Sequence, residues 1–524
     1  MFHIGRFFLN LRNAGGLILF PINLLKHNSL SIRQLASQTF WYGFSNIFGR
    51  FLNYLLTPLL TGIFASEKYG DISVLFASAA FLQVVYSFGM ETSYFRFTRD
   101  HAEEKIYNNG GIILLVLTLL LTGLLLLPTQ LMADYLAIGE HPEYIQWILL
   151  IVALDNLAVL PFSKLRHEGR PRKFAGIKIL NILTNIGLVL FFLVWCKGAY
   201  ERGEDTVWAR FYDPSIDIGY VIIANMVASA FTLLLLWKEI TALRFSIDRT
   251  LLRQMLVYAA PLLIVGFGGM VNETIDRIML TRLYPGSVDD ARSANGIYSA
   301  NAKLAVVITL FITAFRMGAE PFFFRQSKEG KAPETYARVM NFFVITCCVC
   351  FLSVMLFLDI WKHFMGIRKH PEYLEGLKVV PLLMLGKVFL GIYYNLSIWY
   401  KLTNRNLMAA WITLAGAGIT ILLNALLIPA YGFMGCAIAS LICYGFMMLI
   451  SYLQGQKYYP VPYAWKKSIG YIITCVGLFG IHQWFREQSP SVLYTHLAGI
   501  LLSLSFAGLV AFTERKELAA LRRR

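Results

Sequence analysis

The stretch NIFGRFLNYLLTPLL, residues 46–60, decides the fold, because its composition is that of a helix buried in lipid. It is the middle of an apolar segment, 38–63, whose one charged side chain is Arg50. At 1.5 Å per residue, about 20 apolar residues cross a hydrocarbon core roughly 30 Å thick. A charged group at the centre of that core costs at least about 2.5 kcal/mol if it faces lipid. Arg50 is therefore predicted to face the protein interior.

Segments of the same kind recur along the whole chain. Of its 524 residues, 57% are hydrophobic and 15% are charged, and the mean hydropathy is +0.57. These values are far from those of soluble domains and predict an all-α polytopic membrane protein with about 14 transmembrane helices. The predicted spans are 38–63, 72–95, 111–133, 143–162, 174–195, 218–237, 254–280, 296–318, 335–358, 377–400, 407–428, 432–453, 467–485 and 491–513.

The basic residues predict how the chain is oriented. If the N-terminus is cytoplasmic, the cytoplasmic segments hold 29 Lys and Arg residues and the opposite loops hold 10. Positively charged segments are retained on the cytoplasmic side, so both termini are predicted to be cytoplasmic. The net charge of +16 then reflects topology and contact with anionic lipid headgroups, and no nucleic-acid partner is expected.

A short internal repeat predicts two lobes. Gly70-x-x-Ser73 opens the second span, and Gly296-x-x-Ser299 opens the eighth. If six helices repeat, the two lobes are related by an axis along the membrane normal, because an even number of helices keeps their orientation. We predict a cytoplasmic amphipathic lead-in at 1–37, an N-terminal lobe at 38–240 and a C-terminal lobe at 241–453. Two further helices and a basic cytoplasmic tail are expected at 454–524.

Several classes of function are disfavoured by what the sequence lacks. It contains no phosphate-binding loop, no zinc-protease motif and no nucleophile elbow with triad partners, and its loops are too short for a catalytic domain. The seven cysteines lack metal-binding spacing. We therefore expect a transporter and not an enzyme, with no metal and no cofactor.

Polar residues inside the spans indicate where a transport pathway would lie. Asn46, Arg50 and Asn53 are spaced four and three residues apart, which places them on one face of the first helix. Further polar groups are Glu91 in the second span, Asp155 in the fourth, Lys178 in the fifth, Asn272, Glu273 and Asp276 in the seventh, Lys303 in the eighth and Lys387 in the tenth.

The basic members of this set predict an anionic cargo. We expect Arg50 to line a water-filled cleft with Lys303, Lys387 and Lys178, because guanidinium and ammonium groups bind phosphate through charge-assisted hydrogen bonds. The alternative is a structural role in ion pairs, Arg50 with Glu91 or Lys303 with Asp276. We interpret Arg277, Arg316 and Lys378 as side chains near helix ends that reach the membrane interface.

Three stretches carry a resemblance to a known family. They are SQTFWYGFSNIFGRFLNYLLTPLLTGIFASEKYG (37–70), SFGMETSYFRF (87–97) and NALLIPAYGFMGCAIAS (424–440). They resemble the bacterial polysaccharide flippases, the Wzx-type O-antigen and capsule transporters of the multidrug/oligosaccharidyl-lipid/polysaccharide superfamily. In the third stretch, Pro429 and Gly432 are expected to form a tight outer turn and Gly435 to allow close packing of two helices.

The resemblance implies a function and a set of site residues. It implies a flippase of the bacterial inner membrane that moves an undecaprenyl-pyrophosphate-linked oligosaccharide repeat unit by alternating access. The candidate substrate-binding residues are Arg50, Lys303, Asn46, Asn53, Asn272 and Lys387, and the candidates for coupling to a proton or a sodium ion are Glu273, Asp276, Glu91 and Asp155. We expect a monomer among membrane lipids, with a polysaccharide polymerase and a chain-length regulator as candidate protein partners.

Other functions stay open at this point. A lipid II flippase of the same superfamily would have a similar pathway. A multidrug/cation antiporter would need an acidic, aromatic cavity without Arg50. A membrane-embedded polysaccharide polymerase or ligase would need large outer loops that carry catalytic Arg or His residues, which the sequence lacks.

Overall fold

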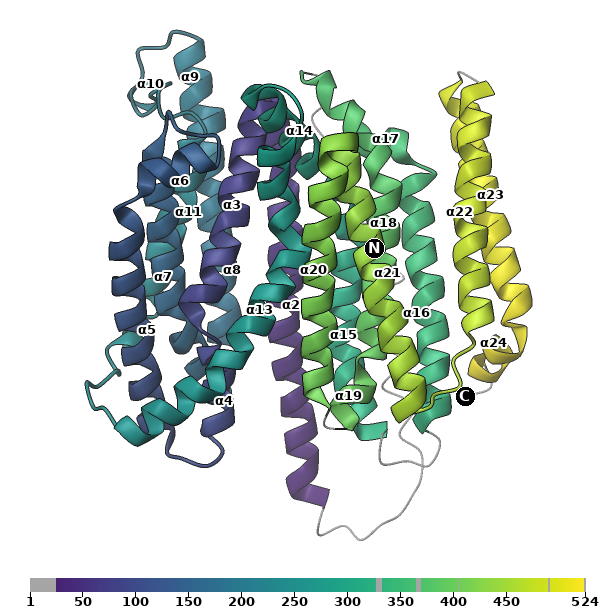
Figure 1. The fold of residues 1–524 in the computed structure, drawn as a ribbon, viewed down its shortest axis with the longest axis horizontal. Helices are drawn as coiled ribbons and strands as arrows, with labels where there is room; N and C mark the ends of the chain where they lie inside the picture. Colours follow the sequence, from purple (N-terminus) through teal and green to yellow (C-terminus); the bar gives the residue numbers. More distant parts are fainter. Residues whose placement is uncertain (1–24, 327–331, 364–368, 404, 489–490, 523–524) are drawn as a thin grey trace.

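The computed structural model describes residues 25–326, 332–363, 369–403, 405–488 and 491–522, and all regular elements in these ranges are helices (Figure 1). The N-terminal half contains α2 (Leu25–Ile63), α3 (Ser66–Ser87), α4 (Met90–Phe97), α5 (Glu103–Leu126), α6 (Thr129–Tyr135), α7 (Pro142–His167), α8 (Pro171–Leu190), η2 (Phe191–Cys196), α9 (Lys197–Glu201), α10 (Val207–Arg210), α11 (Gly219–Leu235) and α12 (Trp237–Ile240). The next part contains α13 (Arg249–Leu283), α14 (Val288–Ala302), η3 (Lys303–Ala305), α15 (Val306–Gln326), α16 (Ala332–Met355), α17 (Leu358–His363), η4 (Pro371–Val379), α18 (Val380–Leu396), α19 (Ile398–Leu402), α20 (Asn406–Tyr431) and α21 (Phe433–Tyr458). The chain ends with α22 (Trp465–Gln488), α23 (Val492–Thr513) and α24 (Arg515–Arg522).

The helices confirm a polytopic membrane protein. In the described part of the chain, 12 helical segments are long and apolar enough to cross a membrane. The 17-residue apolar helix α11 and the 39-residue helix α2 occupy the two remaining predicted spans. Helix α2 begins at Leu25, so residues 25–37 continue the first membrane helix, whereas we predicted a separate lead-in there. The rest of the predicted lead-in, 1–24, lies outside the described residues.

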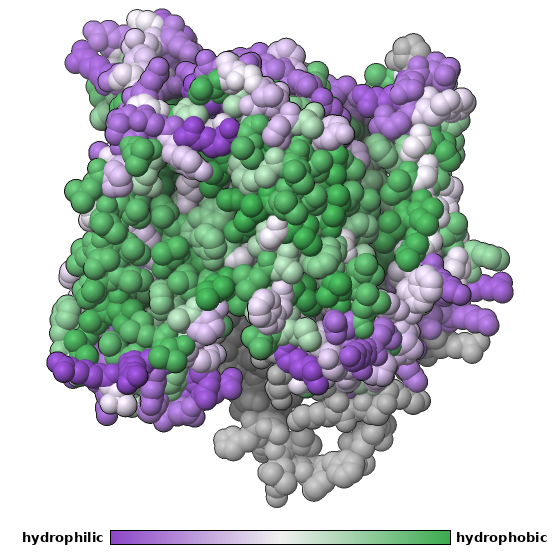
Figure 2. All heavy atoms as spheres, viewed as in Figure 1, coloured by the Kyte–Doolittle hydropathy of each residue, from purple (hydrophilic) through white to green (hydrophobic). Residues whose placement is uncertain are grey.

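The surface of the molecule matches a membrane environment. Figure 2 shows, on the face in view, a band of hydrophobic side chains across the middle of the molecule, with hydrophilic side chains gathered above and below it. Helices satisfy their backbone hydrogen bonds internally, which is required where no water is present. The upper end in Figures 1 and 2 carries α9 and α10 and is the side that the basic residues predict to be outside.

The packing of helices repeats between the two halves, as the predicted two-lobe fold requires. In the N-terminal lobe (α2–α11), α2 packs on α8, α8 on α11 and α11 on α7. In the C-terminal lobe (α13–α21), α13 packs on α20, α20 on α21 and α21 on α18. When only the membrane helices are counted, each of these helices is the sixth after its counterpart in the N-terminal lobe. The residue boundaries of the two lobes stay predictions.

The two lobes meet at their outer ends along α3 and α14. A β-carbon on Gly70 would collide with the carbonyl oxygen of Arg292, and one on Gly296 would collide with that of Ser66. Glycine at both positions therefore lets the two backbones touch. These glycines are the ones that open the two copies of the sequence repeat.

Polar contacts flank this glycine contact. The Oγ atoms of Ser66 and Ser293 lie 2.7 Å apart, and Ser73 donates to Ser299 over 2.6 Å. Arg292 of α14 binds both carboxylate oxygens of Asp71 on α3, at 2.8 and 2.6 Å. We call these contacts between α3 and α14, with the two glycines, the outer seal.

The lobes also touch toward the opposite end of the molecule. Helix α13 crosses from its own lobe to pack on α4 and α5 of the other lobe (Figure 1). Met255 and Ala259 of α13 are buried there with Tyr94 of α4. Helix α2 packs on α15, where a β-carbon on Gly43 would lie 3.1 Å from the sulfur of Met317.

The turn between α20 and α21 is as tight as the sequence predicts. Gly432 has φ 55° and ψ −136°, a conformation that is essentially restricted to glycine. A β-carbon on Gly435 would lie 2.6 Å from the backbone carbonyl of Leu427, so glycine is needed for the two helices to pack this closely. The predicted roles of Gly432 and Gly435 are confirmed.

The two C-terminal helices stand beside the C-terminal lobe, with α22 and α23 packed on α16 (Figure 1). Glu514, at the end of α23, is 3% exposed. Its carboxylate accepts hydrogen bonds from Tyr471 at 2.7 Å, Asn341 at 3.0 Å and Lys467 at 3.1 Å. Burial by itself would raise the pKa of Glu514, but these hydrogen bonds outweigh burial and hold the pKa below its ordinary value of 4.5.

We expect Glu514→Ala to destabilise the detergent-solubilised protein by about 2 kcal/mol, the usual contribution of hydrogen bonds to a charged group. Because the folded-state pKa is depressed, the stabilisation is present above pH 4.5 and is lost as the pH falls below it. Thermal unfolding at neutral and acidic pH measures both effects. The control is Glu517→Ala, which removes an exposed pair with Arg338 and should cost less than about 1 kcal/mol. Equal loss in both variants would contradict the role of Glu514.

Candidate functional site

Arg50 lies where the two lobes meet. Helix α2 carries it against α15 of the other lobe, where its Nη1 atom is 3.5 Å from Oγ1 of Thr313. The side chain is exposed, although it lies in the middle of a membrane helix. The alternative that we considered, an ion pair of Arg50 with Glu91, is not formed, because Glu91 binds Arg166 over 2.5 Å. The rest of the protein therefore does not cover this guanidinium group, and its role in binding a cargo stays a prediction.

Lys303 lies at a break in the eighth membrane helix. The sequence predicted one continuous helix, but α14 ends at Ala302 and a 3-10 turn, η3, precedes α15. The side chain of Lys303 is not covered by the rest of the protein. Within the described part of the chain it forms no ion pair, so the alternative that we considered, a structural pair of Lys303 with Asp276, is not formed. The basic group in its electrostatic range is Arg277.

Asp276 is paired with its neighbour on the chain. Arg277 donates to it over 2.7 Å and also to the backbone oxygen of Glu273 over 2.8 Å. The hydroxyl of Tyr298 donates to the other carboxylate oxygen over 2.5 Å, and Asp276 is 6% exposed. These contacts are those of a structural ion pair. A role of Asp276 in ion coupling stays a prediction.

Arg277 and Lys387 extend the basic region around Arg50 and Lys303. Lys387 is within electrostatic range of Glu273, Arg277 and Arg50, and its ammonium group lies 5.2 Å from the ring of Tyr444. The interpretation of Arg277 as a side chain that reaches the membrane interface is wrong, because Arg277 is surrounded by protein and paired with Asp276. We call Arg50, Glu273, Arg277, Lys303 and Lys387 the central cluster.

A cavity of about 250 Å³ in the C-terminal lobe adjoins the central cluster through Glu273. Arg316, which we also interpreted as an interfacial side chain, lines this cavity with its guanidinium carbon 4.1 Å from the ring centre of Tyr394. The amide of Asn272 donates to the backbone of Thr413 at 3.1 Å and accepts from Thr420 at 3.0 Å. Asn272 is therefore engaged within its own lobe in this conformation and does not present a free amide to a sugar.

The remaining predicted residues are not all part of the central cluster. Asn53 is exposed on α2, and the side chain of Asn46 lies outside the described residues.

Lys178, expected beside Arg50, lies instead in a second cavity inside the N-terminal lobe, together with Asp155 and Glu91. We call this cavity, which has a volume of about 640 Å³, the N-lobe pocket. Its lining residues are Phe76, Ala79, Ala80, Gln83, Glu91, Ile151, Val152, Asp155, Ala158, Val159, Phe162, Arg166, Phe174, Lys178, Asn181, Asn225, Ser229 and Thr232.

The charges of the two regions differ. In the central cluster, the basic groups outnumber the one carboxylate, and the adjoining Asp276 is already neutralised by Arg277. In the N-lobe pocket, Asp155 and Glu91 are balanced by Lys178 and Arg166. The central cluster can therefore attract a phosphate-bearing group, whereas the N-lobe pocket suits a neutral polar group.

The helices define a two-lobed membrane protein with a basic cluster at the junction of its lobes. Solved structures with this fold include "Lipid II flippase MurJ, inward closed conformation", with a TM-score of 0.65, 16% identity, and coverage of 90% of this chain and 98% of that one. They also include an inward-facing multidrug resistance MATE family transporter of the MOP superfamily, with a TM-score of 0.61, 13% identity and coverage of 78% and 94%. A third is a MATE structure in the straight conformation, with a TM-score of 0.55, 13% identity and coverage of 81% and 95%.

The family is shown by the sequence itself. The family described as "Polysaccharide biosynthesis protein" matches residues 35–327, more than half of the chain, and the protein belongs to that family. It shares its fold with the lipid II flippase MurJ and with a MATE family transporter of the MOP superfamily. A comparison with curated protein sequences found no match.

Proposed function

We propose that the protein is a flippase that moves an undecaprenyl-pyrophosphate-linked oligosaccharide repeat unit across the bacterial inner membrane, with both termini in the cytoplasm. The observation that carries this proposal is the central cluster. It places Arg50 of one lobe within electrostatic range of Lys387 of the other, at membrane depth. A pyrophosphate is the group on such a lipid that needs basic partners inside the membrane.

The outer seal determines on which line the central cluster is closed toward the outer side. With α3 and α14 in backbone contact and Arg292 bound to Asp71, the path from the central cluster to the outer side is closed along this line. A cargo bound at Arg50 and Lys303 would leave outward only after these contacts separate. Alternating access then consists of rocking of the two lobes, with the outer seal broken in the outward-open state. The polyprenyl tail would stay in lipid.

The family supports a polysaccharide cargo, since its description names polysaccharide biosynthesis. The central cluster also suits lipid II, because lipid II carries the same pyrophosphate. An organic cation would be repelled by Arg50, Lys303 and Lys387. A function as a multidrug/cation antiporter is therefore less well supported. Glu273 is exposed beside these cations and is our candidate for a coupling proton or sodium ion.

A flipping assay in proteoliposomes tests the proposal. The purified full chain is given three cargoes: an undecaprenyl-pyrophosphate-linked oligosaccharide extracted from the source cells, lipid II, and the cation ethidium. We expect rapid movement of the first cargo, at least about tenfold faster than lipid II, as one well-placed set of contacts allows, and no movement of ethidium. Faster transport of lipid II would establish the second candidate function, and transport of ethidium alone would refute both.

A further inference from the structure

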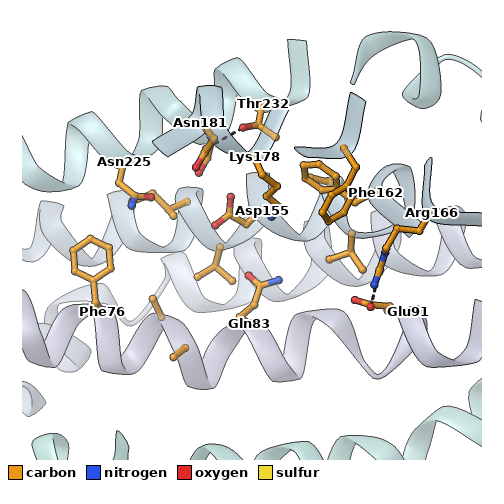
Figure 3. Close-up of a pocket in the computed structure, with 18 residues that line it drawn as sticks. Phe76, Gln83, Glu91, Asp155, Phe162, Arg166, Lys178, Asn181, Asn225 and Thr232 are labelled. Atoms are coloured by element: carbon orange, nitrogen blue, oxygen red, sulfur yellow. Dashed lines mark hydrogen bonds and ion pairs between the residues drawn. The ribbon is translucent and has the colours of Figure 1, made fainter. Parts of the chain in front are cut away.

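The N-lobe pocket is a polar chamber at membrane depth that the proposed pyrophosphate site does not use. It lies between α3, α7, α8 and α11, as the close-up in Figure 3 shows, with Gln83 extending from α3 toward Asp155 and Lys178. Asp155 lies in the interior of a membrane helix and is nevertheless exposed. Polar groups at this depth are costly unless they find partners, so the pocket needs water or a ligand.

Several side chains of the pocket have hydrogen-bonding capacity to spare. In the part of the chain that the structure describes, Gln83 and Asn225 have no hydrogen-bond partner in the protein. Asn181 uses its amide nitrogen to bind Thr232 over 2.9 Å, which leaves its carbonyl oxygen. Lys178 contacts the ring of Phe162, 4.3 Å from its centre.

These groups match one chemical class of ligand. Two free amides, a carboxylate and an ammonium group together offer both donors and acceptors, as hydroxyl groups require. The charges of the pocket balance, which disfavours a phosphate there. Aromatic side chains such as Phe76 and Phe162 supply apolar faces. A ligand with many hydroxyl groups and apolar ring faces is a sugar.

The pocket lies close to the central cluster. A β-carbon on Gly49 would lie 2.6 Å from the side chain of Ile182 on α8. Gly49 precedes Arg50 directly, and Ile182 follows the pocket residue Asn181 directly. The helix that carries Arg50 therefore packs directly on α8, one of the helices that line the N-lobe pocket.

We propose that the N-lobe pocket binds the oligosaccharide part of the cargo, while the central cluster binds the pyrophosphate. This inference rests on the proposed function. Recognition of the sugar by Gln83, Asn225 and Asn181 adds affinity beyond that of the lipid pyrophosphate. The pocket is thus where the protein distinguishes its own repeat unit from other lipid-linked sugars.

The test separates the two contributions. Binding of undecaprenyl pyrophosphate and of the undecaprenyl-pyrophosphate-linked oligosaccharide from the source cells is measured on the full chain in nanodiscs, and the ratio of the two affinities gives the contribution of the sugar. In the double variant Gln83→Leu/Asn225→Leu, we expect that ratio to fall by about tenfold or more, since two hydrogen bonds are lost. The affinity for undecaprenyl pyrophosphate itself should not change.

The control is Asn185→Leu, the same kind of substitution on α8 at a residue outside the pocket lining, which should leave the ratio unchanged. An unchanged ratio in the double variant would overturn the inference and leave the proposed function standing. A double variant that keeps the ratio but loses a dependence of binding on sodium or pH would also overturn it, and would assign the pocket to a coupling ion. Failure of the wild type to bind undecaprenyl pyrophosphate would refute the proposed function itself.

Discussion

Replacing Arg50 by alanine is expected to abolish surface polysaccharide while the protein remains at normal abundance in the membrane. Arg50 lies at the interface of the lobes, is exposed at membrane depth and contacts Thr313 weakly at 3.5 Å, so the fold loses little when it is removed. A charge-assisted hydrogen bond contributes about 1.5–3 kcal/mol, so the affinity for pyrophosphate should fall roughly ten- to hundredfold. Flipping by purified protein in proteoliposomes measures the effect.

Two further substitutions sharpen this prediction. Arg50→Lys should restore part of the activity, because lysine keeps the charge but lacks the planar fork that binds two phosphate oxygens at once. Arg338→Ala removes an exposed arginine that pairs with Glu517 and should flip like the wild type. Full polysaccharide display by Arg50→Ala would mean that this guanidinium group does not hold the cargo.

A disulfide across the outer seal is expected to stop transport completely. The Oγ atoms of Ser66 and Ser293 are 2.7 Å apart on opposite lobes, so cysteines at both positions could form a disulfide after a small adjustment. The bond would fix α3 on α14 and prevent the outward-open state. Oxidation of the double variant Ser66→Cys/Ser293→Cys should abolish flipping, and a reductant should restore it.

The single variants Ser66→Cys and Ser293→Cys serve as controls under the same oxidation, and they also report any effect of the native cysteines. Both should stay active. Mass spectrometry confirms that the bond has formed. Normal flipping by the fully oxidised double variant would show that α3 and α14 do not separate during transport.

The sequence predicted those parts of the fold that depend on local chemistry. The lengths of the apolar segments predicted the membrane-spanning helices. Gly432 and Gly435 predicted a tight turn between two closely packed helices, because few other residues fit at such positions. The repeat at Gly70 and Gly296 was visible because both copies need glycine for the same backbone contact. That the two copies touch each other could not be read from the chain, because it depends on how the lobes are placed in space.

The candidate site was predicted less completely. Arg50 was recognised because a single charge in an apolar segment stands out. Arg277 was missed because it lies toward the end of the 35-residue helix α13, where a membrane interface was the simpler explanation. The helix break beside Lys303, at η3, was not predicted, because the apolar segment 296–318 continues through it. Asp155 and Lys178 were identified as polar residues within membrane spans. The pocket that they share could not be predicted, because it depends on how four helices pack against one another.

The central claim is that the protein holds a pyrophosphate between its lobes. The most direct test compares how tightly the purified protein in nanodiscs binds undecaprenyl pyrophosphate and undecaprenol, the neutral alcohol with the same tail. The two ligands share the tail and differ in the charged group. We expect binding of the pyrophosphate to be at least about tenfold tighter in the wild type, in keeping with one or more charge-assisted contacts. That preference should nearly disappear in the triple variant Arg50→Ala/Lys303→Ala/Lys387→Ala. Equal binding of the two lipids by the wild type, or an unchanged preference in the triple variant, would contradict the assignment of the central cluster.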